Sequence, residues 1–201
     1  MHRQEVIVIP KPPSVSWEEI SQVLQKSHKE NAEKGVIMPF PFMRPDEIRK
    51  KIENRGGVMF VALLDGQLIG TGATYFIDKN FWCGNGLYAY NCFVSVLPEH
   101  AGKGVYKKLA LKQEEYIKSK HVNRIFFDTH EKNKRIIEVS RKNGYEFVNF
   151  ILRKKHNSIY MVKWLDNPPY THFQCVIKFW KLKIRKKYRA YKKEFKKKLH
   201  L

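Results

Sequence analysis

The feature that most constrains the fold is a strand that passes through a glycine turn directly into a helix. Residues 87–96 read as a long apolar strand, Pro98 ends it, and Gly102-Lys-Gly104 leads into a helical pattern over residues 105–120. The first amides of a helix have no partners inside the helix and lie at the positive end of its dipole. Glycines let the backbone approach a ligand and turn such amides outward. The segment therefore predicts a cradle for a pyrophosphate group, with a plain tight turn as the alternative.

The sequence also excludes several kinds of site. The spacing GxxxxGK[ST] is absent, and the pattern GxGxxG fails at Lys107, so neither common nucleotide-binding motif is present. The three cysteines, Cys83, Cys92 and Cys175, are widely spaced and form no CxxC pair. We therefore expect neither a disulfide framework nor a zinc site, and a reducing compartment fits this cysteine usage.

The remaining elements predict an α/β fold with the order β-α-α-β-β-β-α-β-α-β-β. Ser16 and Glu19 match a capping box at the start of a helix, and Asp65-Gly66 suits the tight type I′ turn of a hairpin. Because strands alternate with helices in the second half, a partly parallel sheet is expected. Strands are expected at residues 5–9, 58–64, 67–76, 87–96, 124–129, 145–152 and 158–165, and helices at residues 16–35, 45–54, 105–120 and 133–143.

Two segments together resemble the GNAT superfamily of N-acetyltransferases. Residues 94–106, Val-Ser-Val-Leu-Pro-Glu-His-Ala-Gly-Lys-Gly-Val-Tyr, look like the family's strand, Pro-Glu, Arg/Gln-x-x-Gly-x-Gly/Ala and helix. Residues 133–145 look like its Asn-x-x-Ala-x-x-Leu-Tyr-x-Lys-x-Gly-Phe. The resemblance covers about residues 5–165 and makes residues 1–170 an acyltransferase domain. It implies a mixed, mostly antiparallel sheet of six or seven strands, whose fourth and fifth strands splay apart, flanked by helices.

The resemblance implies acetyl-CoA, or another acyl-CoA, as co-substrate, with no metal. Ala101 stands where the family has Arg or Gln, and its backbone amide would serve instead. Tyr106 stands where the family has Gly or Ala, so its side chain must point away from the pyrophosphate. The cofactor-binding residues so implied are Val94 and Val96 for the pantetheine arm, Ala101, Gly102, Lys103, Gly104, Val105 and Tyr106 for the pyrophosphate, and Asn133 for a hydrogen bond to the arm.

In this family the acceptor amine attacks the thioester directly, and it must be neutral to do so, which requires a base or a water chain. The strand at 87–96 contains no Asp or Glu, so the candidate bases are Asp128, His130 and Tyr90. Ser140 replaces a family tyrosine that often acts as general acid toward the departing thiolate, and water is the alternative donor. Packing, capping and surface exposure are the structural explanations that compete with each of these roles.

Residues 171–201 form a segment of a different character. They contain 12 Lys or Arg and one acidic residue, which gives a net +11 of the chain's +20. The pattern predicts a basic amphipathic helix lying on an anionic membrane surface, with docking, self-association, nucleic-acid binding and disorder as alternatives. Its apolar residues recur at steps of three and four: Phe173, Ile177, Trp180, Ile184, Tyr188, Tyr191, Phe195 and Leu199.

The sequence thus predicts a cytoplasmic N-acetyltransferase, peripheral to the inner face of the membrane, with a small amine as acceptor. Residues 161–170 and the Lys-rich segment after them are similar to enzymes of bacterial surface-polysaccharide biosynthesis, which implies an amino sugar on a nucleotide or lipid carrier. The alternative is a catalytically weak binding module of the same fold, whose tail binds membrane or nucleic acid. No signal peptide or stretch of 18 uncharged apolar residues is present, and monomer and dimer remain open.

Overall fold

The predicted order of elements is the order observed. The structure is a computed structural model that describes residues 5–33, 35–36, 42–78, 86–152, 157–166 and residue 177. Its elements are β1 (Val6–Pro10), α1 (Trp17–Glu33), α2 (Pro45–Glu53), β2 (Val58–Leu64), β3 (Gln67–Asp78), β4 (Leu87–Val96), η2 (Pro98–His100), α3 (Val105–Ser119), β5 (Arg124–His130), α4 (Lys134–Lys142), β6 (Glu146–Leu152) and β7 (Asn157–Trp164).

Local chemistry explains two of the element boundaries. Before α1, the Ser16 amide donates to Glu19 Oε2 at 2.7 Å, and the Glu19 amide donates to Ser16 Oγ at 3.1 Å. This is the predicted capping box, and it satisfies amides that the helix cannot pair internally. Between β2 and β3, Asp65 and Gly66 adopt φ values of 49° and 80°. These left-handed angles are those of the predicted type I′ turn.

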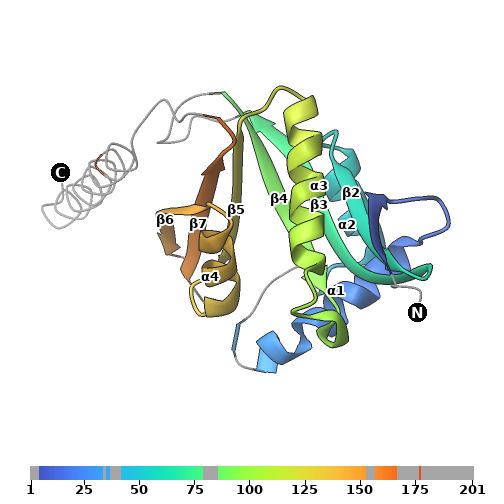
Figure 1. Cartoon of the computed structure of the whole chain (residues 1–201). Helices are drawn as coiled ribbons and strands as arrows, with labels where there is room; N and C mark the ends of the chain where they lie inside the picture. The colour runs from blue at the N-terminus through green and yellow to red at the C-terminus, as the bar shows by residue number, and fades with distance from the viewer. Residues whose placement is uncertain are drawn as a thin grey trace, which may run out of the picture.

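The sheet has seven strands in the order β1-β2-β3-β4-β5-β7-β6, and only the β4–β5 pair is parallel. That pair is short: Ala89 lies opposite Ile125 and Tyr90 opposite Phe126, and no later residues of the two strands pair. Yet β4 continues to Val96 and β5 to His130. The two strands therefore diverge along most of their length (Figure 1), which confirms the predicted splayed sheet.

Helices cover both faces of the sheet, with α3 and α4 on one face and α1 and α2 on the other (Figure 1). On the α1/α2 face, Ile20, Leu24 and Ile48 are fully buried against strands β2 to β4. On the α3 face, Leu109 is fully buried in a cluster with Phe60. Burying each such side chain contributes about 1.5–3 kcal/mol, so the two layers fix the helices beside the diverging strands.

Several predictions fall outside the described residues. These are Cys83, Cys175 and all of residues 171–201 except Ile177. Cys92 is a free thiol. In the part of the chain that the structure describes, no helix is long and apolar enough to cross a membrane.

Candidate active site

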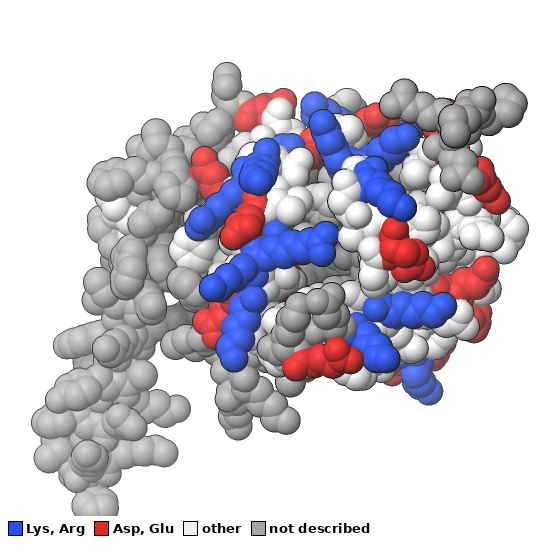
Figure 2. Space-filling view, turned by 60° about the horizontal axis from the view of Figure 1, so that its bottom comes forward, with Lys and Arg blue, Asp and Glu red and all other residues white. Residues whose placement is uncertain are grey.

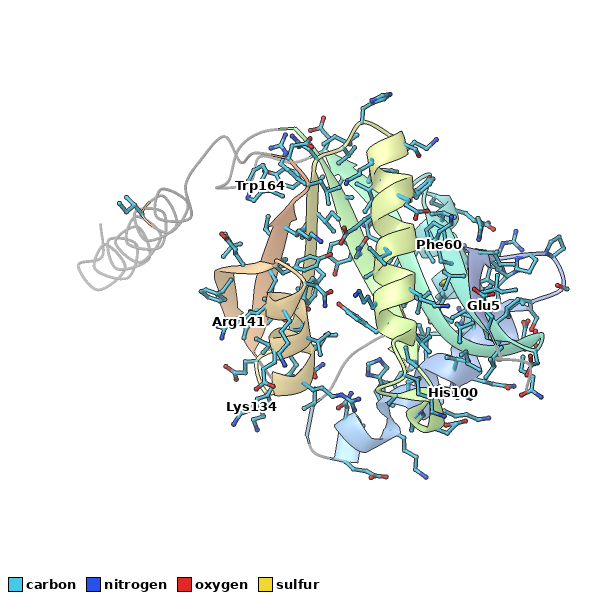
Figure 3. All side chains as sticks on the ribbon, viewed as in Figure 1. Glu5, Phe60, His100, Lys134, Arg141 and Trp164 are labelled. Carbon is cyan, nitrogen blue, oxygen red and sulfur yellow. The ribbon has the colours of Figure 1, made fainter. Side chains whose placement is uncertain are left out.

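A cavity of about 570 Å³ lies where β4 and β5 diverge. Residues of both strands, of the turn before α3 and of helices α1 to α4 line it. Figure 2 looks toward this end of the molecule and shows Lys and Arg side chains on several sides of a hollow. In Figure 3, His100 and Lys134 lie at this open end, near the starts of α3 and α4. Trp164 lies at the opposite end, where the strands are paired.

The glycine turn presents unused amides to this cavity. Gly102 and Gly104 adopt φ values of 78° and 80°, and a Cβ built on either would have open space around it. Within the described residues, the amides of residues 102–107 donate no hydrogen bond of standard geometry, and the next amide, Lys108, donates to the Gly104 carbonyl at 3.1 Å. A row of free donors therefore lies at the positive end of the α3 dipole, as an anion site requires.

Ala101 departs from the prediction. Its amide donates to the Pro98 carbonyl at 3.0 Å, within the short helix η2. The expectation that this amide is an open donor is therefore wrong, because the 3₁₀ turn that follows Pro98 already uses it.

A bulge bends β4 beside the cavity. Phe93 has φ 53°, and the β3–β4 register shifts between Thr71 and Ala73. The Thr71 hydroxyl donates to the Phe93 carbonyl at 2.8 Å, which holds the bulge in place. A bulge of this kind increases the local twist and bend, and here it lies beyond the part of β4 that pairs with β5.

The edge of β4 beyond the bulge faces the gap. The Leu97 amide donates to Ile69 on β3 at 2.9 Å, so it points away from β5. Successive amides of a regular strand point to opposite edges, and the Val96 amide therefore points toward the edge where β5 would pair; Val94 lies two residues before it, next to the bulge. Neither residue has a partner on β5. This edge is open to an extended ligand that pairs with the strand.

Tyr90 and Asp128, two of the predicted catalytic residues, meet across the gap. The Tyr90 hydroxyl donates to Asp128 Oδ1, and both residues line the cavity. Burial, and secondarily the Asp128 charge, raise the pKa of Tyr90 well above its usual value, so the phenol keeps its proton. Its ring packs against Tyr75 and Phe126, with centroids 4.9 Å and 4.7 Å away. The packed ring holds the donor against the carboxylate.

His130 shares a face of β5 with Asp128 but lies about 7 Å further along the strand. It is buried, its Nδ1 accepts the Lys132 amide at 3.1 Å, and it is not among the residues that line the cavity. Of the two predicted groups at the end of β5, the structure therefore brings Asp128 to the cavity and leaves His130 outside it.

Ser140 is likewise not among the lining residues, but it lies behind one of them, Tyr106. Ser140 is fully buried, and its hydroxyl makes no hydrogen bond of standard geometry within the described part of the chain. It nevertheless lies close enough to Tyr106 to influence that residue: burial raises the pKa of the Tyr106 phenol, and Ser140 partly offsets the increase. Two of the three positions at which the sequence departs from the family motifs, Tyr106 and Ser140, are thus neighbours in space.

Asn133 caps α4 and lines the cavity. Its amide Nδ2 donates to Thr129 Oγ1 at 3.2 Å, and its backbone amide donates to the His130 carbonyl at 2.9 Å. These bonds fix the start of α4 against the end of β5, on the side of the gap facing the glycine turn.

Helix α1 supplies a wall of the cavity that no sequence motif indicated. His28 Nε2 lies 3.0 Å from Ser95 Oγ, and Asn31 Nδ2 lies 3.3 Å from His28 Nδ1. An amide nitrogen can only donate, so Nδ1 accepts and Nε2–H donates to Ser95. Burial lowers the pKa of His28 to about 4, so the imidazole is neutral. The sequence did contain one signal of this wall: His28 is a polar residue that continues the apolar stripe of α1.

Comparison with known proteins identifies the family to which this fold belongs. A model of the acetyltransferase (GNAT) family matches residues 17–145, well over half of the chain. No curated protein sequence matches the chain. Among solved structures, an acetyltransferase from Streptococcus agalactiae is similar, at 19% identity and a TM-score of 0.63 over 81% of this chain and 100% of that one.

Two further solved structures share the fold. The PaiA N-acetyltransferase from Thermoplasma acidophilum, in complex with coenzyme A, is 18% identical, with a TM-score of 0.58 over 80% of this chain and 99% of that one. A ribosomal-protein-alanine N-acetyltransferase from Brucella melitensis is 16% identical, with a TM-score of 0.59 over 79% and 99%. At these identities the likenesses establish the fold and leave the acceptor open.

Proposed function

We propose, because this chain belongs to the acetyltransferase (GNAT) family, that it transfers an acetyl group from acetyl-CoA to the amine of a small molecule by direct attack on the thioester. The chain is an N-acetyltransferase by family. The observation that carries it is the row of unpaired amides at residues 102–107, at the open end of a split between β4 and β5.

The residues of the open end fit coenzyme A. Its diphosphate carries the negative charge that the start of α3 favours, and Gly102 and Gly104 leave open space before the amides. Arg135 and Lys107 line the same cavity and add positive charge. The similar PaiA enzyme was solved with coenzyme A, which supports the same donor here.

The edge of β4 supplies the next contacts. The edge at Val94 and Val96 is placed to hydrogen-bond an extended arm as a neighbouring strand would. A thioester carbonyl gains negative charge as the amine adds to it. A fixed backbone donor at this edge would stabilise that charge without reorganising, which is where such donors contribute most.

Asp128 is the base in this scheme. An ammonium ion must lose a proton before its nitrogen can attack, and Asp128 is the carboxylate that lines the cavity where the strands separate. It would take the proton directly or through one water. The Tyr90 hydroxyl holds the carboxylate in position. His130, which the sequence offered as an alternative, lies outside the cavity lining.

Tyr106 is the donor to the departing thiolate. Its raised pKa keeps the phenol protonated, so it can stabilise the thiolate by a hydrogen bond, and it lines the cavity, whereas Ser140 does not. Ser140, the predicted acid, would act only indirectly, through its influence on the pKa of the Tyr106 phenol.

A pair of glycine variants tests the cradle. Gly104 and Gly66 both have φ 80° and open space around a Cβ, so Gly104→Ala and Gly66→Ala introduce the same backbone strain. We expect Gly104→Ala to weaken coenzyme A binding roughly tenfold in titration calorimetry, because it displaces the amides that bind the diphosphate. Gly66→Ala should bind normally. Equal affinities in the two variants, or no acetyl transfer to any amine, would count against the proposal.

The acceptor that we propose within this class is an amino sugar on a nucleotide or lipid carrier, as in surface-polysaccharide biosynthesis. What supports it is the resemblance of residues 161–170 and the following Lys-rich segment. Turnover of a nucleotide-linked amino sugar, compared with polyamines and peptide N-termini, checks this choice. A preference for peptides would contradict it.

We also propose that residues 171–201 bind an anionic membrane surface from the cytoplasmic side. The support is their net +11 and the apolar stripe in their sequence. Deleting this segment should abolish sedimentation with vesicles that contain anionic lipid while leaving coenzyme A binding intact. Unchanged vesicle binding would overturn the proposal, and binding to RNA that falls steeply with salt would favour nucleic acid instead.

A further inference from the structure

The cavity has one basic side chain at its α1/α2 wall that the proposed reaction does not use. Lys51, on α2, lines the cavity, and its Nζ lies 5.2 Å from the centre of the Phe93 ring. Within the described residues it makes no ion pair with an acidic side chain. Its neighbour Lys50 differs: it is exposed, and its Nζ lies 3.9 Å from Asp46 on the outer side of α2.

Phe93 fixes where the Lys51 charge lies. This residue is the bulge of β4 and lies three residues beyond Tyr90, the last residue of β4 that pairs with β5. An ammonium over an aromatic face is attracted by the ring, by about 0.5–1 kcal/mol in exposed settings. The contact orders the flexible lysine stem in advance, so less entropy is lost when the ammonium meets an anion.

Lys51 and Asp128 act on the same short stretch of wall. Lys51, Cys92 and Asp128 all line the cavity. Burial raises the pKa of the Cys92 thiol; the Lys51 charge lowers it and the Asp128 charge raises it. Both charges are therefore within electrostatic reach of one buried side chain, although they come from different walls. The acceptor side of the cavity thus carries a carboxylate on β5 and the Lys51 ammonium on α2.

We propose that Lys51 forms an anion subsite, and that the acceptor is an amine that also carries a carboxylate or a phosphate. This inference rests on the proposed function and deepens it. The amine nitrogen would lie at Asp128, where it loses its proton and attacks the thioester, and the anionic group would lie at Lys51. A neutral amine would leave Lys51 without its ionic partner, and a substrate with a second amine would be repelled there.

Matched pairs of acceptors test the subsite: an amino acid and its amide, and an amino-sugar phosphate and its unphosphorylated sugar. We expect the wild-type protein to favour the anionic member of at least one pair by roughly tenfold or more in kcat/KM, as a charged hydrogen bond would give. The pair that shows the preference distinguishes carboxylate from phosphate.

Variants locate the effect. Lys51→Gln should reduce the preference close to one, mainly through KM, while Lys51→Arg keeps most of it. Lys50→Gln is the matched control, because it removes the same charge from the outer side of α2. Calorimetry of the N-acetylated anionic product with coenzyme A present gives a readout without turnover, and Lys51→Gln should weaken that binding roughly tenfold.

The outcomes separate the two proposals. Equal turnover of anionic and neutral acceptors by the wild-type protein overturns the subsite but leaves the transferase intact. An equal loss of preference in Lys50→Gln and Lys51→Gln also overturns it, because it would show a diffuse field rather than a site. A protein that binds coenzyme A but acetylates no amine contradicts the proposed function itself. If Lys51→Gln does not fold, Lys51→Arg and the wild-type comparison still decide.

Discussion

The two ends of the β4–β5 pair are built for different purposes. At the closed end, Ala89 and Ile125 are fully buried and lie opposite each other, and Arg124 donates to the Tyr88 hydroxyl at 3.1 Å. At the open end, Val94 and Val96 have no partner on β5, and the amides of residues 102–107 have none within the described residues. One pair of strands thus offers both a packed core and an unsatisfied backbone edge.

The comparison teaches that the unsatisfied edge depends on the closed end. Buried amides without hydrogen-bond partners cost free energy of folding. Neighbouring strands of a sheet would therefore ordinarily pair along their whole length, or another element would cover the amides. Here the closed end, the bulge at Phe93 and the helices on both faces hold the strands apart. Substitutions at the closed end should therefore reduce stability, and those at the open end should reduce activity.

Ile125→Ala should have the largest effect, on stability. The side chain is 0% exposed at the closed end, and removing such a residue costs about 2–5 kcal/mol of the free energy of unfolding. Urea unfolding measures the loss, and Leu111→Ala, at an exposed position on α3, is the control. Activity per folded molecule should be retained. A loss of stability no larger than that of the control would remove the distinction between the ends.

Asp128→Asn should lower kcat by roughly 100-fold, the usual range for loss of a general base, with little change in melting temperature. Asparagine keeps the shape and still accepts the Tyr90 hydrogen bond, so the variant isolates proton transfer. Asp78→Asn, at the exposed end of β3, should behave as wild type. An unchanged kcat in Asp128→Asn would exclude Asp128 as the base and return the assignment to water.

His28 should make the open end sensitive to acid. Burial lowers its pKa to about 4. As the pH falls, the imidazole therefore binds a proton near pH 6.5 in the unfolded chain but only near pH 4 in the folded chain. The associated stability is complete above pH 6.5 and is lost as the pH falls toward 4, by about 1–2 kcal/mol at pH 5. Urea unfolding across this range should show a shallower loss for His28→Gln than for wild type. Parallel curves would show that His28 is not the titrating group.

Tyr106→Phe should have the smallest effect. Removing one hydrogen bond to a thiolate that already departs readily should lower kcat by roughly three- to tenfold. Tyr116→Phe, on the same helix and away from the cavity lining, is the matched control. Equal kcat values for the two variants would assign the donor role to water instead.

Several local features of the fold, including the turn at the open end, could be predicted from the sequence. The capping box at Ser16, the turn at Asp65-Gly66 and the glycines before α3 are local signals, and each adopts the backbone that its residue type favours. The splay followed from the resemblance to the family and is confirmed. Local chemistry and the family motif therefore sufficed for the fold.

The walls of the cavity could not be predicted in the same way. His28 and Lys51 reach it only because α1 and α2 pack across the sheet at a particular angle, which periodicity within one helix does not specify. β5 last pairs with β4 at Phe126, and of the residues beyond that point Asp128 lines the cavity and His130 does not, which a local pattern could not show. Tyr106 and Ser140 come together only through the packing of two helices. The sequence therefore could not show that these two departures from the family motifs lie side by side.

Amide hydrogen exchange with and without coenzyme A tests the central claim most directly. If the open edge binds the donor, saturating coenzyme A should slow exchange at the amides of Gly102 to Tyr106 and at Val94 and Val96. The amide of Gly66, in a turn of the same backbone angle, should not change. Binding of coenzyme A that leaves the 102–106 and β4 amides exchanging as before would contradict the account.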